Sequence, residues 1–296
     1  VITANRVPLP SKKVGSSISI ITGKEIEKSQ SKSVSELLRK VPAVAVSRSG
    51  PVGAFTQVRI RGAEGNHTLV IIDGVEINDV SGGSEFDFGN MIASDIERIE
   101  VLRGPQTALY GSDAVGGVIN IITKKGKGPA TATVSIEAGS QKSGRIQSNI
   151  RGSGEKYHYS LGITGSATEG FSVADTDTGN TETDGNYHRN TNLKFGFEPI
   201  KDLELNFFAR YHTATQETDD QPAVAGKIVT IDTTDYTRTR QRTGRVSISY
   251  DLMDGKWENE IGIGFSDDKS ESLTSSAPSR ANGAKSQFDY QSNYFF

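Results

Sequence analysis

Residues 111–117 read Gly-Ser-Asp-Ala-Val-Gly-Gly and have the glycine density of a loop that binds phosphate. Such a loop needs a lysine and a hydroxyl residue directly after its last glycine, because an ammonium and a metal-bound hydroxyl must reach the phosphates. Here the last glycine is followed by the β-branched run 118–123, which is interrupted only by Asn120 and predicts a strand. The residues therefore predict a glycine turn next to strands rather than a nucleotide site.

Other reactive residue types are scarce. The chain of 296 residues has no cysteine, which excludes disulfides, thiolate metal ligands and a cysteine nucleophile. Its four histidines, His67, His158, His188 and His212, lack the paired spacing of metal ligands, and we interpret them as ordinary polar residues. No Ser/His/Asp order or carboxylate pair has a catalytic setting, so we expect no enzyme and no catalytic cofactor. A formal charge of −3 without a basic stripe argues against a nucleic-acid partner.

Two polar segments are rich in the hard oxygen ligands that calcium prefers. Residues 175–186 carry such ligands at alternate positions, and further aspartates follow at 219, 220, 232 and 235. A structural calcium ion that cross-links the two segments would use the following candidate ligands: Asp184, Asn186, Asp219, Asp220 and Asp232. The alternative is an ordinary acidic surface that only contacts water.

The chain changes character near residues 124–129. Before this point, an approximate apolar face at helical spacing predicts one helix over residues 22–40, and it is formed by Ile26, Val34, Leu37, Leu38 and Val41. After this point no helix is expected, because apolar and polar residues alternate in runs that are separated by Gly, Asp, Asn, Ser and Thr. There are eight such runs, at 132–138, 144–152, 156–166, 190–198, 203–213, 237–252, 256–267 and 284–296.

The alternation predicts long strands with one apolar and one small or polar face. In the seventh run, Ile261, Ile263 and Phe265 share a face, and the residues between them are glycines, Gly262 and Gly264. A soluble β-sandwich would hide the apolar face, but the predicted connections alternate between short turns (201–202 and 254–255) and long polar loops (168–189 and 214–236). This asymmetry is typical of an outer-membrane β-barrel, which we favour over the sandwich.

The number of predicted strands raises a question about size. The interior of an eight-stranded barrel is only wide enough for side chains, so it could not enclose the residues that precede the strands. The last residues, 293–296, lie inside a strand-like run with no closing turn. We therefore expect the chain to be a piece of a larger barrel, or its first part to lie outside as a separate domain. No apolar run reaches the length of a membrane helix, and the first residues lack the pattern of a signal peptide.

The first 125 residues carry several motifs in a specific order. They are Arg-Ile-Arg-Gly at 59–62, Val-Ile-Ile-Asp-Gly-Val at 70–75, Ile-Glu-Arg-Ile-Glu-Val-Leu-Arg-Gly-Pro at 96–105, Leu-Tyr-Gly at 109–111 and Gly-Gly-Val-Ile-Asn-Ile-Ile-Thr at 116–123. This series resembles the plug domain of TonB-dependent outer-membrane receptors, and within them the cobalamin (vitamin B12) receptors and their relatives.

The resemblance implies a fold and an organisation. It implies an α+β plug domain inside a transmembrane antiparallel β-barrel of about 22 strands, in the outer membrane of a Gram-negative bacterium. Residues 1–125 would hold the remnant of a TonB box and the plug, and residues 126–296 would hold the N-terminal part of the barrel. The residues expected to bind TonB are Val1, Ile2, Thr3 and Ala4, which are similar to the end of a TonB box that pairs by strand addition.

The charged residues of the plug motifs have a predicted role in its attachment. We expect ion pairs between plug and barrel wall to be formed by Arg59, Arg61, Glu97, Arg98, Glu100 and Arg103. Such pairs fix the geometry but have a modest net stability, so they can be broken in steps when the plug is pulled. The alternative is that these charges only decorate a solvated strand face.

The resemblance also implies import of a scarce nutrient through the plug, with energy supplied by TonB. The expected substrate contacts are Gln57, Asn66, Asn78, Ser81 and Gly82, on plug segments that are small and polar. An anionic ferric siderophore would be met by several arginines, so the scarcity of charge favours cobalamin. The calcium ligands point the same way, since Asp184 and Asn186 fit the calcium-ordered loops of the cobalamin receptor.

Two other functions stay open. One is a ferric siderophore or haem receptor of the same family, and the other is an outer-membrane sensor or adhesin that does not transport. Further expected partners are membrane lipid, lipopolysaccharide and an accessory surface lipoprotein.

Overall fold

The computed structural model describes residues 17–81, 83–172, 174, 177, 180, 182–220, 223–224, 227–228, 230–274 and 277–295. The side chains at 220, 223–224, 227–228 and 231–232 are outside this description. The predicted TonB-binding residues, Val1 to Ala4, and the predicted substrate contact Gly82 therefore lie outside the described residues.

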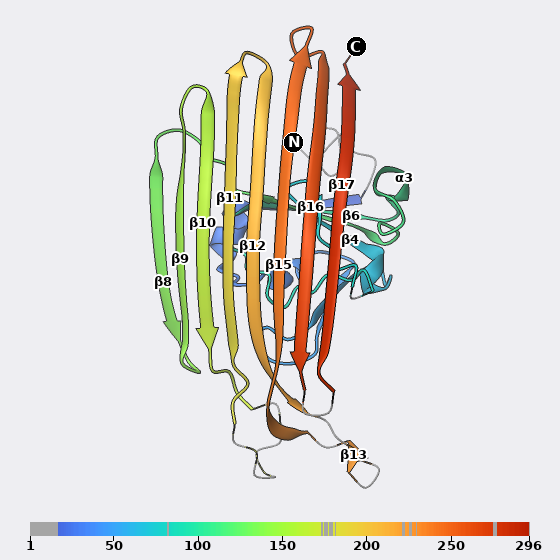
Figure 1. Cartoon of the computed structure of the whole chain (residues 1–296), viewed down its shortest axis with the longest axis vertical. Coiled ribbons are helices and arrows are strands. Elements are labelled where there is room, and N and C mark those ends of the chain that lie inside the picture. Colours follow the sequence, from blue (N-terminus) through green and yellow to red (C-terminus); the bar gives the residue numbers. More distant parts are fainter. Residues whose placement is uncertain are drawn as a thin grey trace.

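The alternating half of the chain forms one antiparallel sheet of eight strands, which we call the wall (Figure 1). Its strands are β8 (Thr131–Gly139), β9 (Ser143–Ser153), β10 (Tyr157–Thr168), β11 (Asn186–Ile200), β12 (Leu203–Asp220), β15 (Ile231–Leu252), β16 (Trp257–Leu273) and β17 (Ser279–Tyr294). Each strand pairs with the next one in the wall, in the order β8-β9-β10-β11-β12-β15-β16-β17. The prediction of long antiparallel strands over this half is confirmed.

The two faces of the wall are the reverse of those in a soluble sandwich. On β16, Ile261, Ile263 and Phe265 are exposed, whereas the small residues between them are buried against the rest of the chain. Neighbouring strands repeat this arrangement, with exposed Val246 and Ile248 on β15. An apolar face that stays open while a polar face is covered fits a sheet whose outer solvent is lipid.

The ends of the wall also differ. At one end, β11 joins β12 through residues 201–202, and β15 joins β16 through residues 253–256. At the other end, longer connections follow β10 and β12 (Figure 1). The predicted loop 214–236 was too long, because β12 and β15 stay paired from Ala214–Thr239 to Thr218–Asp235. Backbone pairing continues there although most side chains are polar, since strands that leave the membrane need only backbone hydrogen bonds.

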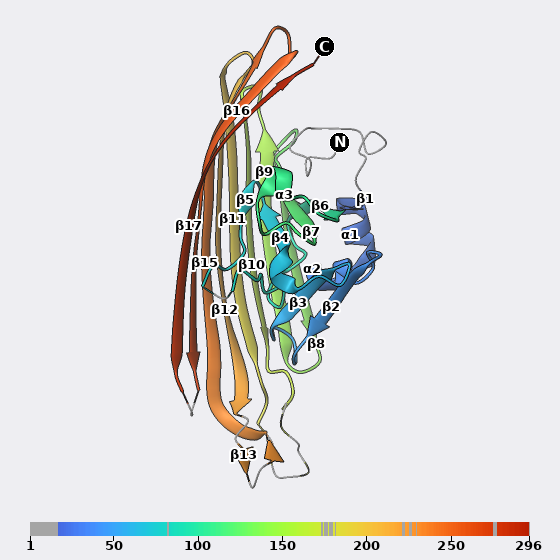
Figure 2. The ribbon, with the colours of Figure 1, turned by 90° about the vertical axis from the view of Figure 1, so that its right-hand side faces the viewer.

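Residues 17–123 form a second unit, the plug, which packs on the concave face of the wall (Figure 2). Its sheet has the order β1-β6-β7-β4-β5, formed by β1 (Ser17–Thr22), β6 (Ile96–Arg103), β7 (Gly117–Thr123), β4 (Thr68–Ile72) and β5 (Val75–Glu76). β4 and β7 are parallel, and the other neighbours are antiparallel. A separate hairpin joins β2 (Val44–Arg48) to β3 (Thr56–Ile60).

The plug has a dry core of its own. All five residues of β4 are buried, as are the apolar residues of β6 and, apart from the half-buried Ile122, those of β7. The glycine-rich residues 111–117 connect the one-turn helix α3 (Thr107–Tyr110) to β7, which confirms the predicted strand after them. Gly117 is required there, because a Cβ at this position would overlap the backbone oxygen of Leu102.

The single helix predicted over residues 22–40 was wrong. The structure has two short helices, α1 (Gly23–Ser29) and α2 (Val34–Leu38). Gln30 adopts the left-handed conformation (φ 49°) and ends α1, while the Ser33 side chain accepts from the Glu36 N–H and caps α2. The serines at 29, 31 and 33 compete for backbone hydrogen bonds, so the helical spacing of the apolar residues alone did not determine where the helix ends. Among the described residues no helix is long and apolar enough to cross a membrane.

Candidate functional site

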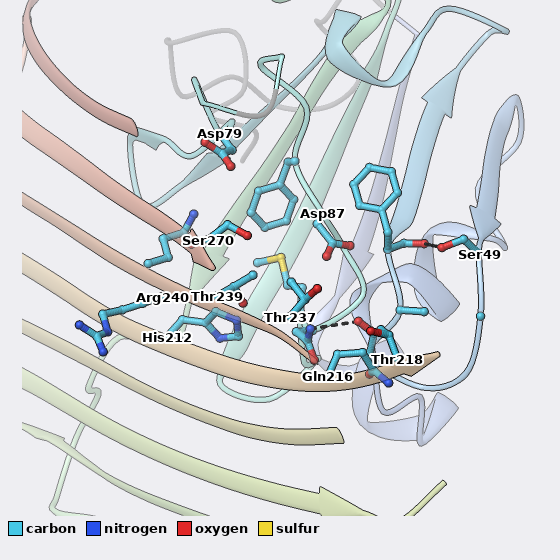
Figure 3. A pocket seen from close by; sticks show the side chains of 18 of the residues that line it. Ser49, Asp79, Asp87, His212, Gln216, Thr218, Thr237, Thr239, Arg240 and Ser270 are labelled. Carbon is cyan, nitrogen blue, oxygen red and sulfur yellow. Dashed lines mark hydrogen bonds between the residues drawn. The ribbon is translucent and has the colours of Figure 1, made fainter. Parts of the chain in front are cut away.

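A cavity of about 460 Å³ lies between the plug and the wall, on the side of the long connections. Plug segments 49–55 and 85–91 form one side of it, and strands β12, β15 and β16 form the other. Figure 3 shows Asp87 on a plug segment and His212, Gln216 and Thr239 on the wall strands around the same space. A ligand in this cavity would therefore contact both units at once.

One carboxylate holds the two plug segments together. Asp87 Oδ1 accepts hydrogen bonds from the backbone N–H of Thr56 and of Gly89, each at 2.8 Å. Burial raises the pKa of Asp87 to about 6, although both N–H groups act in the opposite direction. Asp87 thus fixes the shape of the plug side of the cavity and holds a charge that its surroundings disfavour.

A second polar cluster fixes the plug to the wall beside the cavity. Asn186 Nδ2 on β11 donates to Asn90 Oδ1 of the plug and to Gln216 Oε1 of β12, both at 3.0 Å. Asn90 Nδ2 in turn donates to the backbone oxygen of Gly53 at 3.1 Å. Gly53 has φ +92°, and a Cβ there would overlap the amide atoms of Asn186 and Gln216. Only glycine lets the plug segment approach the wall this closely.

The charged groups around the cavity are mainly acidic. The acidic lining residues are Asp79, Glu85, Asp87, Glu217, Asp219 and Asp268, and the basic ones are Arg210, Arg240 and Lys269. Arg240 and Lys269 are exposed and alternate with the inward-facing Gln241 and Asp268. Figure 3 shows the Arg240 guanidinium directed away from the plug segment with Asp87. Among the lining residues that the structure describes, Arg210 is therefore the one arginine or lysine that lies buried on the inner face.

Arg210 belongs to a polar network that crosses three wall strands. Its guanidinium donates to Gln241 Oε1, and Gln241 Nε2 donates to Asp268 Oδ1 at 2.7 Å. Gln241 Nε2 also reaches the backbone oxygen of Ile77 in the plug at 3.5 Å. The wall side of the cavity is thus linked to the plug by hydrogen bonds.

The predicted substrate contacts are placed in different environments. Asn66 is exposed in the short 3-10 helix η2 (Gly65–His67), away from the cavity lining. Gln57 donates to Glu85 at 3.1 Å, and Ser81 donates to Asp79 at 2.7 Å, so each contacts a residue of the lining. Asn78 is buried, and its amide bonds the backbone of Val70, Thr68 and Ser84. Asn78 therefore shapes the plug and does not face the cavity.

The predicted calcium ligands are only partly described. Asp219 accepts from the backbone N–H of Ala174 at 3.0 Å, and Asp184 is buried. The amide nitrogen of Asn186 is directed to Asn90 and Gln216. The side chains of Asp220 and Asp232 are outside the described residues. In the part that is described, no group of three or more His, Cys, Asp or Glu side chains is placed to hold a metal ion.

The six charged residues expected to attach the plug have described contacts mostly within the plug. Arg59 pairs with Glu64 at 3.2 Å, and Arg98 pairs with the buried Glu100 at 2.7 Å, in both cases within the plug. Glu97 pairs with Lys127, just before the first wall strand, at 2.9 Å.

The other two arginines also stay on the plug. Arg103 donates to the backbone oxygen of Pro42 at 2.9 Å, and Arg61 is exposed with φ +54°. Of the described ion pairs of these six residues, the one between Glu97 and Lys127 joins the plug to the predicted barrel part, residues 126–296. The pairs of Arg59 and Arg98 stabilise the plug itself, and contacts of the other residues with the wall stay a prediction.

Other residues also attach the plug to the wall. Several of them lie at residues 73–76, in the turn after β4 and in strand β5, and we call this segment the anchor turn. Lys194 Nζ on β11 lies 2.5 Å from Asp73 Oδ1, and Lys285 on β17 pairs with Glu76. Gln287 Nε2 donates to the backbone oxygen of Gly74 at 2.7 Å, and its Oε1 accepts from the Glu76 N–H at 3.1 Å.

A second attachment lies before β6. Asn149 Nδ2 donates to Asp95 Oδ1 at 2.7 Å, and the hydroxyls of Ser94 and Thr164 lie 3.1 Å apart. Burial raises the pKa of Asp95 to about 6. The plug is therefore held by two clusters of discrete polar contacts besides the cavity wall.

Two histidines that are distant in the sequence are brought together on the wall. The rings of His188 on β11 and His212 on β12 are 4.8 Å apart, and both side chains are buried. We expected no contact between these histidines from their spacing, and their interpretation as ordinary polar residues stays a prediction. Their spacing of 24 residues could not reveal the contact without the register of the two strands, which places His212 opposite Asn190.

Comparisons with known proteins follow the same division into plug and wall. Residues 10–118 match the family description "TonB-dependent Receptor Plug Domain". The chain is 38% identical over 216 residues to a vitamin B12 transporter of Vibrio vulnificus, a match that covers 72% of this chain and 32% of the relative. It is 37% identical over 221 residues to a vitamin B12 transporter of Photobacterium profundum, covering 74% and 36%.

Solved structures agree on the fold. The siderophore receptor PirA from Acinetobacter baumannii matches 94% of this chain and 45% of its own, with a TM-score of 0.76 and 20% identity. The ferric yersiniabactin uptake receptor FyuA from Yersinia pestis matches the same shares with a TM-score of 0.73 and 20% identity.

These findings identify the chain as a member of the TonB-dependent receptors, which are β-barrel proteins of the Gram-negative outer membrane. The chain spans about a third of the length of the two vitamin B12 transporters. The resemblance found in the motifs and the expected fold class, an α+β plug domain with a transmembrane antiparallel barrel sheet, are thereby confirmed.

Proposed function

We propose that this receptor imports cobalamin, or a similar corrinoid, across the outer membrane with energy from TonB. The identity of 37–38% to two vitamin B12 transporters supports this substrate. The siderophore receptors share the fold at about 20% identity, which carries no argument about what is bound. The proposal includes no catalytic step.

The cavity between plug and wall is the observation that carries the proposal. Its inner lining is rich in carboxylates, while among the described residues Arg210 is the one buried arginine or lysine that lines it. An anionic iron chelate would be matched by several arginines in such a place. Carboxylates and side-chain amides instead accept hydrogen bonds from primary amides, which are the polar groups at the edge of a corrin ring.

The attachment of the plug supports energy-driven movement. The anchor turn and the contacts of Ser94 and Asp95 are discrete polar links, whereas the apolar core of the plug is closed on itself. Breaking a few such links costs far less than unfolding the plug core, because each polar link has a modest net stability in a partly hydrated interface. We propose that pulling on Val1 to Ala4 releases these links in steps.

We also propose that calcium orders the long connections above the cavity. Two contacts already join them, since Gly185 N–H donates to Glu217 at 2.7 Å and Ala174 N–H donates to Asp219 at 3.0 Å. Asp184 and Asp219, with Asp220 and Asp232, would provide the oxygen ligands. A divalent cation at this point would fix the outer side of the cavity.

Calorimetry on the receptor extracted from membranes tests substrate and calcium together. Cobalamin is titrated with calcium and then with a chelator, and a ferric siderophore is the comparison ligand. We expect tight cobalamin binding that weakens without calcium, and no heat from the siderophore. Heat from the siderophore but none from cobalamin would identify the substrate as an iron chelate. Cobalamin binding that is equally tight with the chelator would contradict only the calcium site.

A further inference from the structure

Two arginines on the inner face of the wall differ in their partners. Arg245 on β15 forms ion pairs with Asp289 at 2.5 Å and with Glu260 at 2.9 Å. Arg210 on β12 is 6% exposed, and among the described residues its one hydrogen bond goes to the neutral amide of Gln241. A buried charge without a counter-ion is costly, so the guanidinium of Arg210 suits an anionic partner from outside the chain.

Gln241 separates Arg210 from the carboxylate of Asp268. The guanidinium donates to Gln241 Oε1, and Gln241 Nε2 donates to Asp268 Oδ1 at 2.7 Å. The other carboxylate oxygen, Asp268 Oδ2, accepts from the Ser266 hydroxyl at 3.0 Å. Both oxygens of Asp268 are thus bound to neutral donors. Because a guanidinium has five N–H groups, Arg210 keeps donors for a further acceptor in the cavity that it lines.

His212 provides a second donor next to Arg210. The two residues lie two positions apart on β12, so they point to the same face, and both line the cavity. The ring of His212 is buried on the wall side of the cavity (Figure 3), and its Nδ1 has no hydrogen-bond partner among the described residues. A neutral imidazole has one N–H that can donate. Arg210 and His212 can therefore donate to different oxygens of one anionic group.

The rest of the cavity lining disfavours an anion. Carboxylates line it on the plug and on the wall, among them Asp79, Glu85, Asp87 and Glu217. Because like charges repel, a ligand with one negative group has one favourable place for that group, next to Arg210. Such a match fixes the orientation of the ligand as well as its affinity.

We propose that Arg210 and His212 bind the phosphodiester in the nucleotide tail of the corrinoid. The inference rests on the proposed import of cobalamin, and it assigns the anionic group of that ligand to one place in the cavity. A guanidinium binds phosphate with two parallel hydrogen bonds, which are stronger than bonds between neutral groups. The tail is joined to the corrin ring by a flexible chain, so its phosphate can reach a recessed side chain.

Three corrinoids test the proposal on the wild-type receptor extracted from membranes. They are cyanocobalamin, cobinamide phosphate, which ends at the phosphate, and cobinamide, which lacks both phosphate and nucleotide. Calorimetry measures the three affinities. We expect cobinamide phosphate to bind at least ten-fold more tightly than cobinamide, and added salt to reduce this preference.

The outcomes separate this inference from the proposed function. Equal affinities for cobinamide and cobinamide phosphate would overturn the phosphate site and leave corrinoid import standing. If none of the three corrinoids bound, the proposed import itself would be contradicted, and the phosphate site with it.

Variants of the two residues locate the phosphate. In Arg210→Gln the preference for cobinamide phosphate over cobinamide should disappear, while the affinity for cobinamide stays nearly unchanged. In His212→Phe, which keeps a ring without an N–H, the preference should fall about three-fold, the effect of one hydrogen bond. The matched control is Arg242→Gln, an exposed arginine of β15 outside the cavity lining, which should keep the full preference. An unchanged preference in folded Arg210→Gln would overturn the proposal.

Discussion

At the scale of the residue, Gly53 provides a test of how closely plug and wall must fit. Its φ of +92° and the atoms of Asn186 and Gln216 both oppose a side chain. We expect Gly53→Ala to lower the thermal stability by about 1–3 kcal/mol and the cobalamin affinity by at least ten-fold. The measurements are thermal unfolding and calorimetry.

Gly62 is the matched control, because its φ is +75° and no atom lies near a Cβ there. Gly62→Ala should lower the stability by only about 1 kcal/mol, the cost of placing a Cβ at a positive φ. Equal effects of the two substitutions would mean that the contact with Asn186 contributes nothing.

The raised pKa of Asp87 predicts a dependence of stability on pH. The folded receptor holds a proton on Asp87 up to pH about 6, and the ordinary value is 3.8, so the folded state gains from protonation at low pH. This contribution is present below pH about 4 and is lost as the pH rises through about 6. In Asp87→Asn the Oδ1 can still accept from Thr56 and Gly89, but the group no longer titrates.

We therefore expect the free energy of unfolding of Asp87→Asn to rise above that of the wild type by about 1–3 kcal/mol as the pH increases from 4 to 7, because one pKa unit corresponds to about 1.4 kcal/mol. Thermal unfolding across this pH range measures the difference, with Glu155→Gln in an exposed turn as the control. A difference that does not vary with pH would contradict the assignment.

Single residues also show which contacts could not be predicted from the sequence. Asn78 stands in a small polar segment that suits ligand binding, yet its amide completes the backbone hydrogen bonds of Thr68, Val70 and Ser84. Sequence gives the type of a polar group but not the backbone atoms it faces. The same holds for His188 and His212, which are neighbours only through strand register.

At the scale of the element, the wall was predictable and the attachment of the plug was not. A strand has a side-chain period of two, so alternation in 256–267 reveals its two faces from local sequence. The anchor turn, by contrast, joins Asp73 to Lys194, 121 residues away, and Glu76 to Lys285, 209 residues away. No local pattern can indicate which partner a charge on such a turn will meet.

The anchor turn gives a prediction about stability. Asp73 is 5% exposed and Lys194 is 16% exposed, so Lys194→Met leaves a carboxylate that only Thr123 hydrogen-bonds. We expect a loss of about 3 kcal/mol and a plug that admits large antibiotics through the outer membrane. Thermal unfolding and antibiotic sensitivity measure the two effects.

A double-mutant cycle isolates the pair. Adding Asp73→Asn to Lys194→Met should restore part of the lost stability, because it removes the uncompensated charge. The exposed pair Lys125–Glu204 is the control, and Lys125→Met should cost about 1 kcal/mol or less. Losses of the same size for both lysines would contradict a buried anchor.

At the scale of the whole molecule, the proposed import requires a connection between the N-terminus and the plug. Removal of Val1 to Ala4 should abolish cobalamin uptake and leave cobalamin binding nearly unchanged, since the cavity is formed elsewhere. Uptake of labelled cobalamin by cells and binding to isolated membranes separate the two. Uptake that survives the deletion would favour a sensor or adhesin that does not transport.

The attachment before β6 allows the movement of the plug itself to be tested. The hydroxyls of Ser94 and Thr164 are 3.1 Å apart, one on the plug and one on β10, and the chain has no cysteine that could compete. In the variant Ser94→Cys, Thr164→Cys, oxidation should tether plug to wall. We expect the oxidised receptor to bind cobalamin and not to import it, and we expect a reductant to restore import.

The matched control places the disulfide within the wall. Val246 on β15 and Ile263 on β16 lie directly opposite each other on the exposed outer face of the wall, so Val246→Cys, Ile263→Cys introduces the same bond without touching the plug or the cavity. This variant should import cobalamin in both redox states. Normal import by the oxidised Ser94–Thr164 variant would mean that Ser94 does not separate from β10 during import. The pore would then open by rearrangement of other plug segments. The anchor turn would be the first candidate, because its ion pairs hold the opposite side of the plug sheet.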